Sequence, residues 1–121
     1  MVEKMEELRA LVIWMNDDLD GEVAERYKDQ PLAQDWARVA KAGEEVGEAI
    51  DALIGITGQN PRKGEYGEFG DLIAELADVS LTGLYAIQHF LKGDGGLTIQ
   101  ALMDRARYHR ARREEQLRKA V

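Results

Sequence analysis

The sequence predicts a small all-α protein, and three observations support this. Apolar residues recur three and four residues apart over long segments, which is the spacing of one face of an α-helix. No run of alternating β-branched residues lies between turn residues, so strand signals are missing. Glycine and proline gather at a few places and divide the chain into four helical segments. At 121 residues we expect a single domain, residues 1–121.

The first two helices are predicted from apolar stripes and from the residues that end them. The first is expected from about residue 3 to residue 19. Its stripe consists of Met5, Leu8, Val12, Met15 and Leu19. The second is expected from Pro31, whose ring suits a first helical turn, to about Thr57 before Gly58. Its stripe is predicted to face the core and consists of Leu32, Trp36, Val39, Gly43, Val46, Ile50 and Leu53.

The third helix is expected from about Glu68 to Lys92, and the fourth runs to about Lys119, with Thr98 as its cap. The third has a core stripe of Leu72, Leu76, Val79, Gly83, Ile87 and Phe90. A second apolar set on the same helix points elsewhere: Leu81, Leu84, Tyr85 and Leu91. A helix that is apolar nearly all round needs cover on both sides, which favours a homodimer or homotetramer. The alternative is that the second set lies under the first helix of the same chain.

Charge is distributed unevenly along the chain. Residues 1–103 carry 9 Lys and Arg against 20 Asp and Glu, whereas residues 104–121 carry 7 against 3. An acidic body argues against a stable nucleic-acid partner, for which a basic face is the expected footprint. The chain has no cysteine, so disulfides and thiolate metal sites are excluded. Neither a membrane span nor a signal peptide is expected, and we predict a cytoplasmic protein.

Two acidic motifs, Glu45-x-x-Glu48 and Glu75-x-x-Asp78, form the candidate metal site. On a helical wheel each motif lies on a flank beside the predicted core stripe, and antiparallel neighbouring helices would bring the flanks together. Like charges three or four residues apart destabilise a helix by roughly 0.2 to 0.5 kcal/mol per pair, so a bound cation is expected to neutralise them. Oxygen ligands without nearby His or Cys favour Mg²⁺ or Mn²⁺. The alternative is a pair of solvated acidic faces.

The motifs and the residues around them resemble the MazG-like branch of the all-α nucleoside triphosphate pyrophosphohydrolases. That family has the pattern E-x-x-E and then E-x-x-D on two consecutive helices, matched here by KAGEEVGEA at residues 41–49 and ELADV at residues 75–79. The resemblance extends from about residue 31 to residue 113 and implies a bundle of four to five helices. It implies that Glu45, Glu48, Glu75 and Asp78 bind Mg²⁺. It also implies cleavage of a (d)NTP to the (d)NMP and pyrophosphate, in the service of nucleotide-pool housecleaning.

Such a reaction needs a proton acceptor and cations for the phosphates. Glu44 and Glu45 are both candidates for taking the proton from the attacking water. Arginine forks suit phosphate oxygens, and the last helix is Arg-rich where the family usually has Lys or Asn. The candidate phosphate-binding residues are Lys41, Arg105, Arg107 and Arg110.

A loop between the second and third helices is a candidate substrate loop. It combines turn formers with cations and amides, and its candidate residues are Asn60, Arg62 and Lys63. A plain interhelical turn is the alternative reading. His89 and His109 lack a Glu-x-x-His context, so neither is expected to take part in a metal site. A different class of function also fits the sequence: a non-catalytic helical module that binds an acidic partner or nucleic acid through its basic C-terminal helix.

Overall fold

A computed structural model describes all 121 residues, and it contains four α-helices and no strand. The prediction of an all-α chain is therefore confirmed. The helices are α1 (Val2–Arg26), α2 (Pro31–Thr57), α3 (Phe69–Leu91) and α4 (Gly96–Lys119). The α1 helix continues well past its expected end, whereas the bounds of α2 and α3 lie close to the predicted ones. None of the four helices has both the length and the hydropathy that crossing a bilayer would require.

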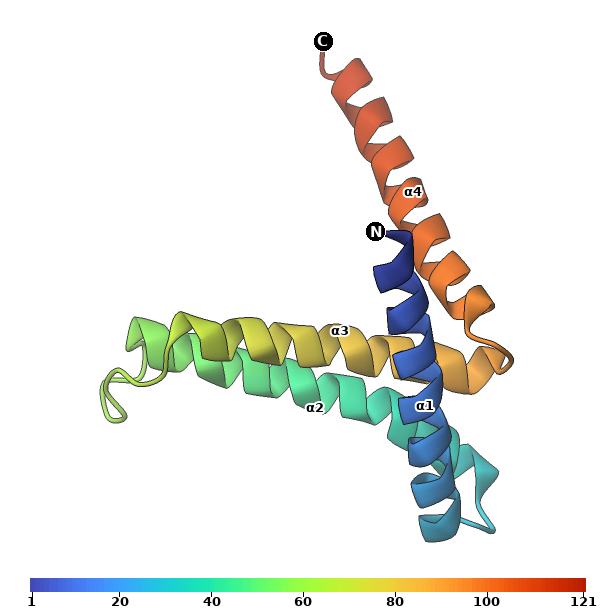
Figure 1. The fold of residues 1–121 in the computed structure, drawn as a ribbon. Coiled ribbons are helices and arrows are strands. Elements are labelled where there is room, and N and C mark those ends of the chain that lie inside the picture. Colours follow the sequence, from blue (N-terminus) through green and yellow to red (C-terminus); the bar gives the residue numbers. More distant parts are fainter.

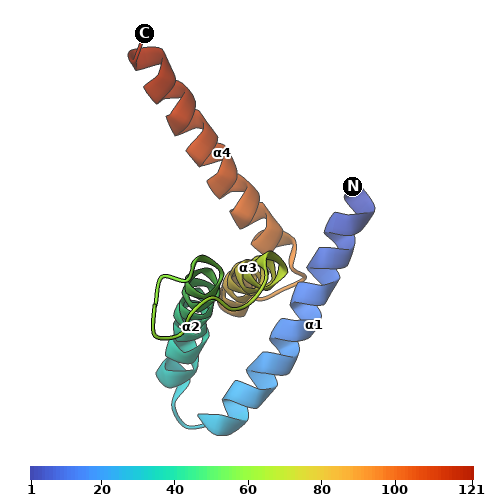
Figure 2. The ribbon, with the colours of Figure 1, turned by 90° about the vertical axis from the view of Figure 1, so that its left-hand side faces the viewer.

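Helices α2 and α3 form a long antiparallel hairpin, and the other two helices join it at one end. Figure 1 shows α1 crossing the hairpin where α2 begins and α3 ends. Helix α4 leaves from the same end and extends away from the hairpin, with the C-terminus at its far end, as Figures 1 and 2 both show. The half of the hairpin nearer its connecting loop is therefore covered by neither α1 nor α4.

The face of α2 that packs against α3 is not the one that the apolar spacing predicted. Its buried residues include Glu45, Ala49 and Gly55, which are small or acidic. The large side chains of the predicted core stripe, from Leu32 to Leu53, are between 44% and 69% exposed. The helix is thus rotated by about one residue, or about 100°, from the expected orientation. Small residues let the two helix axes approach closely, so the large side chains are left on the outside.

The second apolar set of α3 lies mostly against α1, as the alternative interpretation proposed. Leu84 is buried, and Leu81 and Tyr85 line a cavity together with residues of α1. Leu91 remains 44% exposed. The expected need for a second copy therefore does not come from these residues. The outer stripe of α2 is a large exposed apolar surface, in a chain of which only 10 of the 121 residues are buried.

Gly58 lies at the end of α2, and Gly96 and Thr98 lie at the start of α4. Gly58 ends α2 in the left-handed conformation, with φ of 64°. Thr98 is not the cap of α4, as was predicted: it is fully buried, and its hydroxyl donates to Gln88 Oε1 at 2.6 Å. The cap lies three residues earlier, at Gly95 in the left-handed conformation, and Asp94 Oδ1 accepts a hydrogen bond from the Gly96 amide at 2.9 Å.

The hairpin loop returns against α2 through one close contact, which can be tested. A Cβ on Gly55 would lie 2.5 Å from the Tyr66 ring and 2.6 Å from the Tyr66 carbonyl oxygen, so Gly55→Ala must displace backbone. We expect it to lower the free energy of unfolding by about 1 to 3 kcal/mol. The control Gly21→Ala has open space around it and should gain up to about 1 kcal/mol from helix propensity. Urea unfolding followed by circular dichroism measures both, and equal effects would contradict the close contact.

Candidate metal and phosphate site

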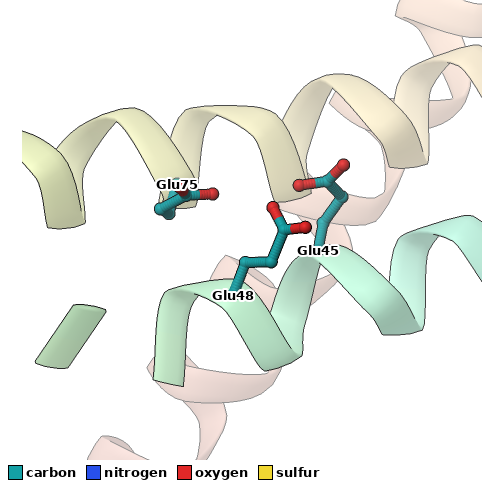
Figure 3. A group of neighbouring side chains, drawn as sticks. All are labelled: Glu45, Glu48 and Glu75. Carbon is teal, nitrogen blue, oxygen red and sulfur yellow. The ribbon is translucent and has the colours of Figure 1, made fainter. Parts of the chain in front are cut away.

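Three of the four predicted ligands converge where α2 and α3 face each other. Carboxylate oxygens of Glu45, Glu48 and Glu75 all lie within 4.8 Å of one another. Figure 3 shows Glu45 and Glu48 rising from α2 toward Glu75 on α3. The antiparallel hairpin produces this convergence, because it places the two motifs side by side along the helix pair.

The rotation of α2 puts Glu45 inside the helix pair rather than on its flank. Its side chain is only 11% exposed, and its Oε2 atom has no hydrogen-bond partner. The Oε2 atom of Glu75 is likewise buried and unpaired. Burial raises the pKa of Glu45, the nearby Glu48 and, to a smaller extent, Asp78 raise it further, and Lys41 acts in the opposite direction. Buried carboxylate oxygens without partners are uncommon in proteins, and a bound cation is one group that could pair with these two.

The three carboxylates have the chemistry of a Mg²⁺ or Mn²⁺ site. They supply hard oxygen donors, no sulfur or imidazole is present among them, and two of their oxygens have no partner within the chain. Asp78, the fourth predicted ligand, is exposed and lies outside the group of three, although its charge acts on Glu45. It lines the same cavity as Glu45, one turn along α3 from Glu75.

An open cavity of about 690 Å³ lies beside the carboxylates, between α1, α2 and α3. Glu44, Glu45 and Asp78 form its acidic end. The rest of its wall combines apolar and aromatic side chains with charged ones. It includes Met15, Leu19, Val23, Tyr27, Leu81 and Tyr85 together with Glu22, Arg26, Arg38 and Lys41. The cavity thus offers carboxylates near which a metal and phosphates could be held, and apolar and aromatic surface suited to a flat group.

A second cavity, of about 570 Å³, opens on the loop side of the carboxylates. It is lined by Glu48 and Glu75 together with Asp51, Tyr66 and Asp71. The Tyr66 hydroxyl donates to Asp51 Oδ1 at 3.0 Å, and burial, followed by this carboxylate, raises the pKa of Tyr66. Because four of these five residues are carboxylates, this side of the site would attract cations rather than free phosphate.

Of the predicted phosphate-binding residues, only Lys41 lies at the site. Its Nζ atom is 3.3 Å from Glu44 Oε1 and 3.6 Å from Glu45 Oε1, and it lines the larger cavity. Arg105, Arg107 and Arg110 lie on the exposed part of α4 and line neither cavity. Arg107 and Arg110 pair instead with acidic residues of α4 itself, and Arg105 lies 4.5 Å from the centre of the Tyr108 ring.

The predicted substrate loop lies at the tip of the hairpin, where it forms a turn of its own. Asn60 Oδ1 accepts a hydrogen bond from the backbone amide of Arg62, and Asn60 O accepts one from that of Lys63. The Lys63 ammonium lies 3.7 Å from Asp51 Oδ1, and Asp51 lines the smaller cavity. None of the three candidate loop residues lines that cavity itself.

Sequence reasoning missed a group of polar residues where α1, α2 and α3 meet. The buried Arg38 guanidinium donates to Asp20 Oδ1 at 3.2 Å, to Asn16 Oδ1, and to the Tyr85 carbonyl oxygen at 3.0 Å. His89, which was expected to have no role in a site, is the centre of this group, because its two ring nitrogens each meet a carboxylate. The position of Arg38 could have indicated its burial, because it lies one heptad before Glu45, on the inner face of α2.

The raised pKa of Glu45 predicts how stability changes with pH in metal-free protein. A carboxyl group whose pKa is raised on folding binds more protons in the folded than in the unfolded state. The free energy of unfolding should therefore fall as pH rises from the ordinary glutamate value of 4.5 through the raised pKa. Glu45→Gln does not titrate there, so its stability relative to wild type should increase with pH.

Urea unfolding in EDTA between about pH 4.5 and about pH 8 tests this dependence. The matched control is Glu3→Gln, since Glu3 is exposed and lies outside the carboxylate group. Its stability relative to wild type should show no comparable trend. A pH-independent difference for Glu45→Gln would contradict the raised pKa.

Comparison of the chain with protein-family models, with curated proteins and with solved structures finds no match. The assignment of function therefore depends on the residues themselves: two acidic motifs on consecutive helices, three carboxylates within 4.8 Å of one another, and a cavity beside them.

Proposed function

We propose that the protein is a Mg²⁺-dependent nucleoside triphosphate pyrophosphohydrolase that cleaves a (d)NTP to the (d)NMP and pyrophosphate. One observation carries the proposal: Glu45, Glu48 and Glu75 converge between two helices, with buried oxygens that no group of the chain satisfies. Few arrangements of this kind are stable without a cation, and a cation held by carboxylates is what the chemistry of polyphosphates requires. The reaction is inferred from the resemblance of the two motifs to the MazG-like pattern.

The three clustered carboxylates would hold the metal, with Asp78 joining them from the next turn of α3. When bound, Mg²⁺ supplies positive charge to the phosphate oxygens and increases the acidity of the attacking water. Because Glu45 belongs to the cluster, Glu44 is the better candidate for the proton acceptor: it is largely exposed and lines both cavities. Lys41, which lies beside Glu44, would bind a phosphate oxygen once substrate enters.

The larger cavity would hold the nucleoside. Its volume of about 690 Å³ is in the range of small-molecule sites, and its acidic end meets the carboxylate cluster. Tyr27 and Tyr85 offer aromatic rings near the opposite wall, and Met15 and Leu19 offer apolar surface. A triphosphate would therefore lie with its phosphates toward Glu45 and its base toward α1.

A homo-oligomer is part of the same proposal. The outer stripe of α2, including Trp36 at 68% and Ile50 at 55% exposed, is too large and apolar to stay in water. A second copy that packs the same stripe against it would bury both symmetrically. In such an assembly α4 of one copy is free to reach the carboxylates of another. That is the route by which Arg105, Arg107 and Arg110 would act on phosphate.

A second candidate function has its own supporting observation. Nearly every residue of α4 beyond its first turn and a half is exposed, and the helix is rich in arginine. The helix is thus free to bind an acidic partner or nucleic acid without any catalysis. In that case substitution of Arg110 and Arg112 would weaken binding with a strong dependence on salt, whereas substitution of Glu48 would leave binding unchanged.

Pyrophosphate release tests the proposed reaction. A panel of canonical and modified NTPs and dNTPs is incubated with wild type in Mg²⁺ or in EDTA, and pyrophosphate is measured. Glu48→Gln keeps the side-chain shape but loses a ligand, and should reduce the rate by at least about 100-fold. Glu3→Gln, a change of the same type on exposed α1, should match wild type. A folded wild-type protein that releases no pyrophosphate from any nucleotide would contradict the proposal.

The oligomer is tested by light scattering after size exclusion. Wild type should have a mass that is a multiple of 13.6 kDa. Ile50→Lys places a charge in the outer stripe and should shift the protein toward the monomer. Leu117→Lys is the matched control, because Leu117 is 52% exposed but lies near the end of α4. A wild-type monomer, or equal masses for both variants and wild type, would show that the stripe is not an interface.

A further inference from the structure

The polar group at the crossing of α1 with the hairpin has His89 at its centre. The His89 Nδ1 atom lies 2.6 Å from Asp20 Oδ1 of α1, and its Nε2 atom lies 2.8 Å from Asp35 Oδ1 of α2. The imidazole, on α3, is therefore held between carboxylates from two other helices. The imidazole is 13% exposed, whereas the side chains of Asp20 and Asp35 are 38% and 45% exposed.

These contacts fix the protonation of the ring. An ionised carboxylate only accepts hydrogen bonds, so both ring nitrogens must carry a proton, and His89 must be an imidazolium. Either neutral tautomer would turn a lone pair toward a carboxylate oxygen. With the guanidinium of Arg38, which also binds Asp20 at 3.2 Å, the group holds two positive and two negative charges.

This group connects α1 to the hairpin. The only fully buried residues of α1 are Val12 and Asn16, and Asn16 itself belongs to the polar group through Arg38. Asp20 follows Leu19 directly in the sequence, and Leu19 lines the cavity beside the carboxylates. Arg38 lines the same cavity. The polar group is thus within one helical turn of the cavity wall that α1 provides, whereas a second contact of α1, from Arg9 to the Asp94 carbonyl oxygen at 2.7 Å, lies nearer the start of the helix.

We propose that His89, as an imidazolium, is a positioning residue that fixes α1 over the hairpin and so sets the wall of the cavity where the substrate would bind. The effect on substrate rests on the proposed function, whereas the fixing of α1 does not. The charged groups that face His89 are Asp20 from α1 and Asp35 from α2, with Arg38 of α2 bound to Asp20.

Two measurements on ligand-free protein test the fixing of α1. Nitrogen-15 spectra at about pH 7 should show both ring nitrogens of His89 protonated. Amides of α1 near Asp20 should exchange hydrogen at least about tenfold faster in His89→Gln than in wild type. The matched control is His109→Gln, because His109 is exposed on α4 and its ring packs edge-on against the ring of Tyr108. It should exchange like wild type.

Asp35→Asn removes one of the two charge partners without changing size and should give the same faster exchange. The double variant with His89→Gln should then be no faster than His89→Gln alone, because Asp35 acts through the ring that His89→Gln removes. A neutral His89 ring in wild type, or α1 exchange unchanged in both variants, would overturn the proposal. If His89→Gln does not fold, the wild-type spectrum and Asp35→Asn still decide.

Steady-state kinetics with the best nucleotide then test the effect on substrate. His89→Gln should raise KM about tenfold and leave kcat near the wild-type value, because α1 faces the nucleoside end of the cavity and not the carboxylates. A fall in kcat at constant KM would overturn that role. Absence of pyrophosphate release from wild type would refute the proposed function alone, since hydrogen exchange in α1 does not depend on turnover.

Discussion

The structure depends on two helices that approach closely enough to bury acidic side chains between them. On α2 the inner face is built from alanine and glycine, so Glu45 lies inside the pair, where Glu48 and Glu75 are its neighbours. Like charges in such a place repel, and burial increases the cost of ionising them, as the raised pKa of Glu45 records. Buried oxygens of Glu45 and Glu75 have no partner within the chain, and a hard cation is a group that such carboxylates can bind.

The same packing leaves an apolar stripe of α2 on the outside of the chain. Since the inner face of α2 is used by small residues, its large apolar side chains point outward and stay exposed. Helix α1 covers only one end of the hairpin, and α4 extends away from it (Figures 1 and 2). Lys41, Arg26 and Arg38 are the cations of this chain that line the larger cavity, and the arginine-rich part of α4 is exposed.

Much of the fold could be predicted from the sequence, because breakers and apolar spacing define helix ends locally. The rotation of α2 could not, since spacing alone favours the largest side chains as the core, and tertiary packing chose Ala49 and Glu45 instead. The convergence of Glu45, Glu48 and Glu75 followed from motif order and an antiparallel hairpin. The contacts of His89 did not, because Asp20 and Asp35 are distant in the sequence and no local pattern joins them. The directions taken by α1 and α4 are likewise set by contacts beyond the reach of periodicity.

The central claim is that the three carboxylates form a site for a divalent cation. The most direct test is a crystal of the protein soaked with Mn²⁺, with anomalous scattering used to locate the ion. A peak bound by Glu45, Glu48 and Glu75, and lost in Glu48→Gln, is the predicted result. Well-ordered carboxylates with no peak between them, or a peak only elsewhere on the acidic surface, would contradict it.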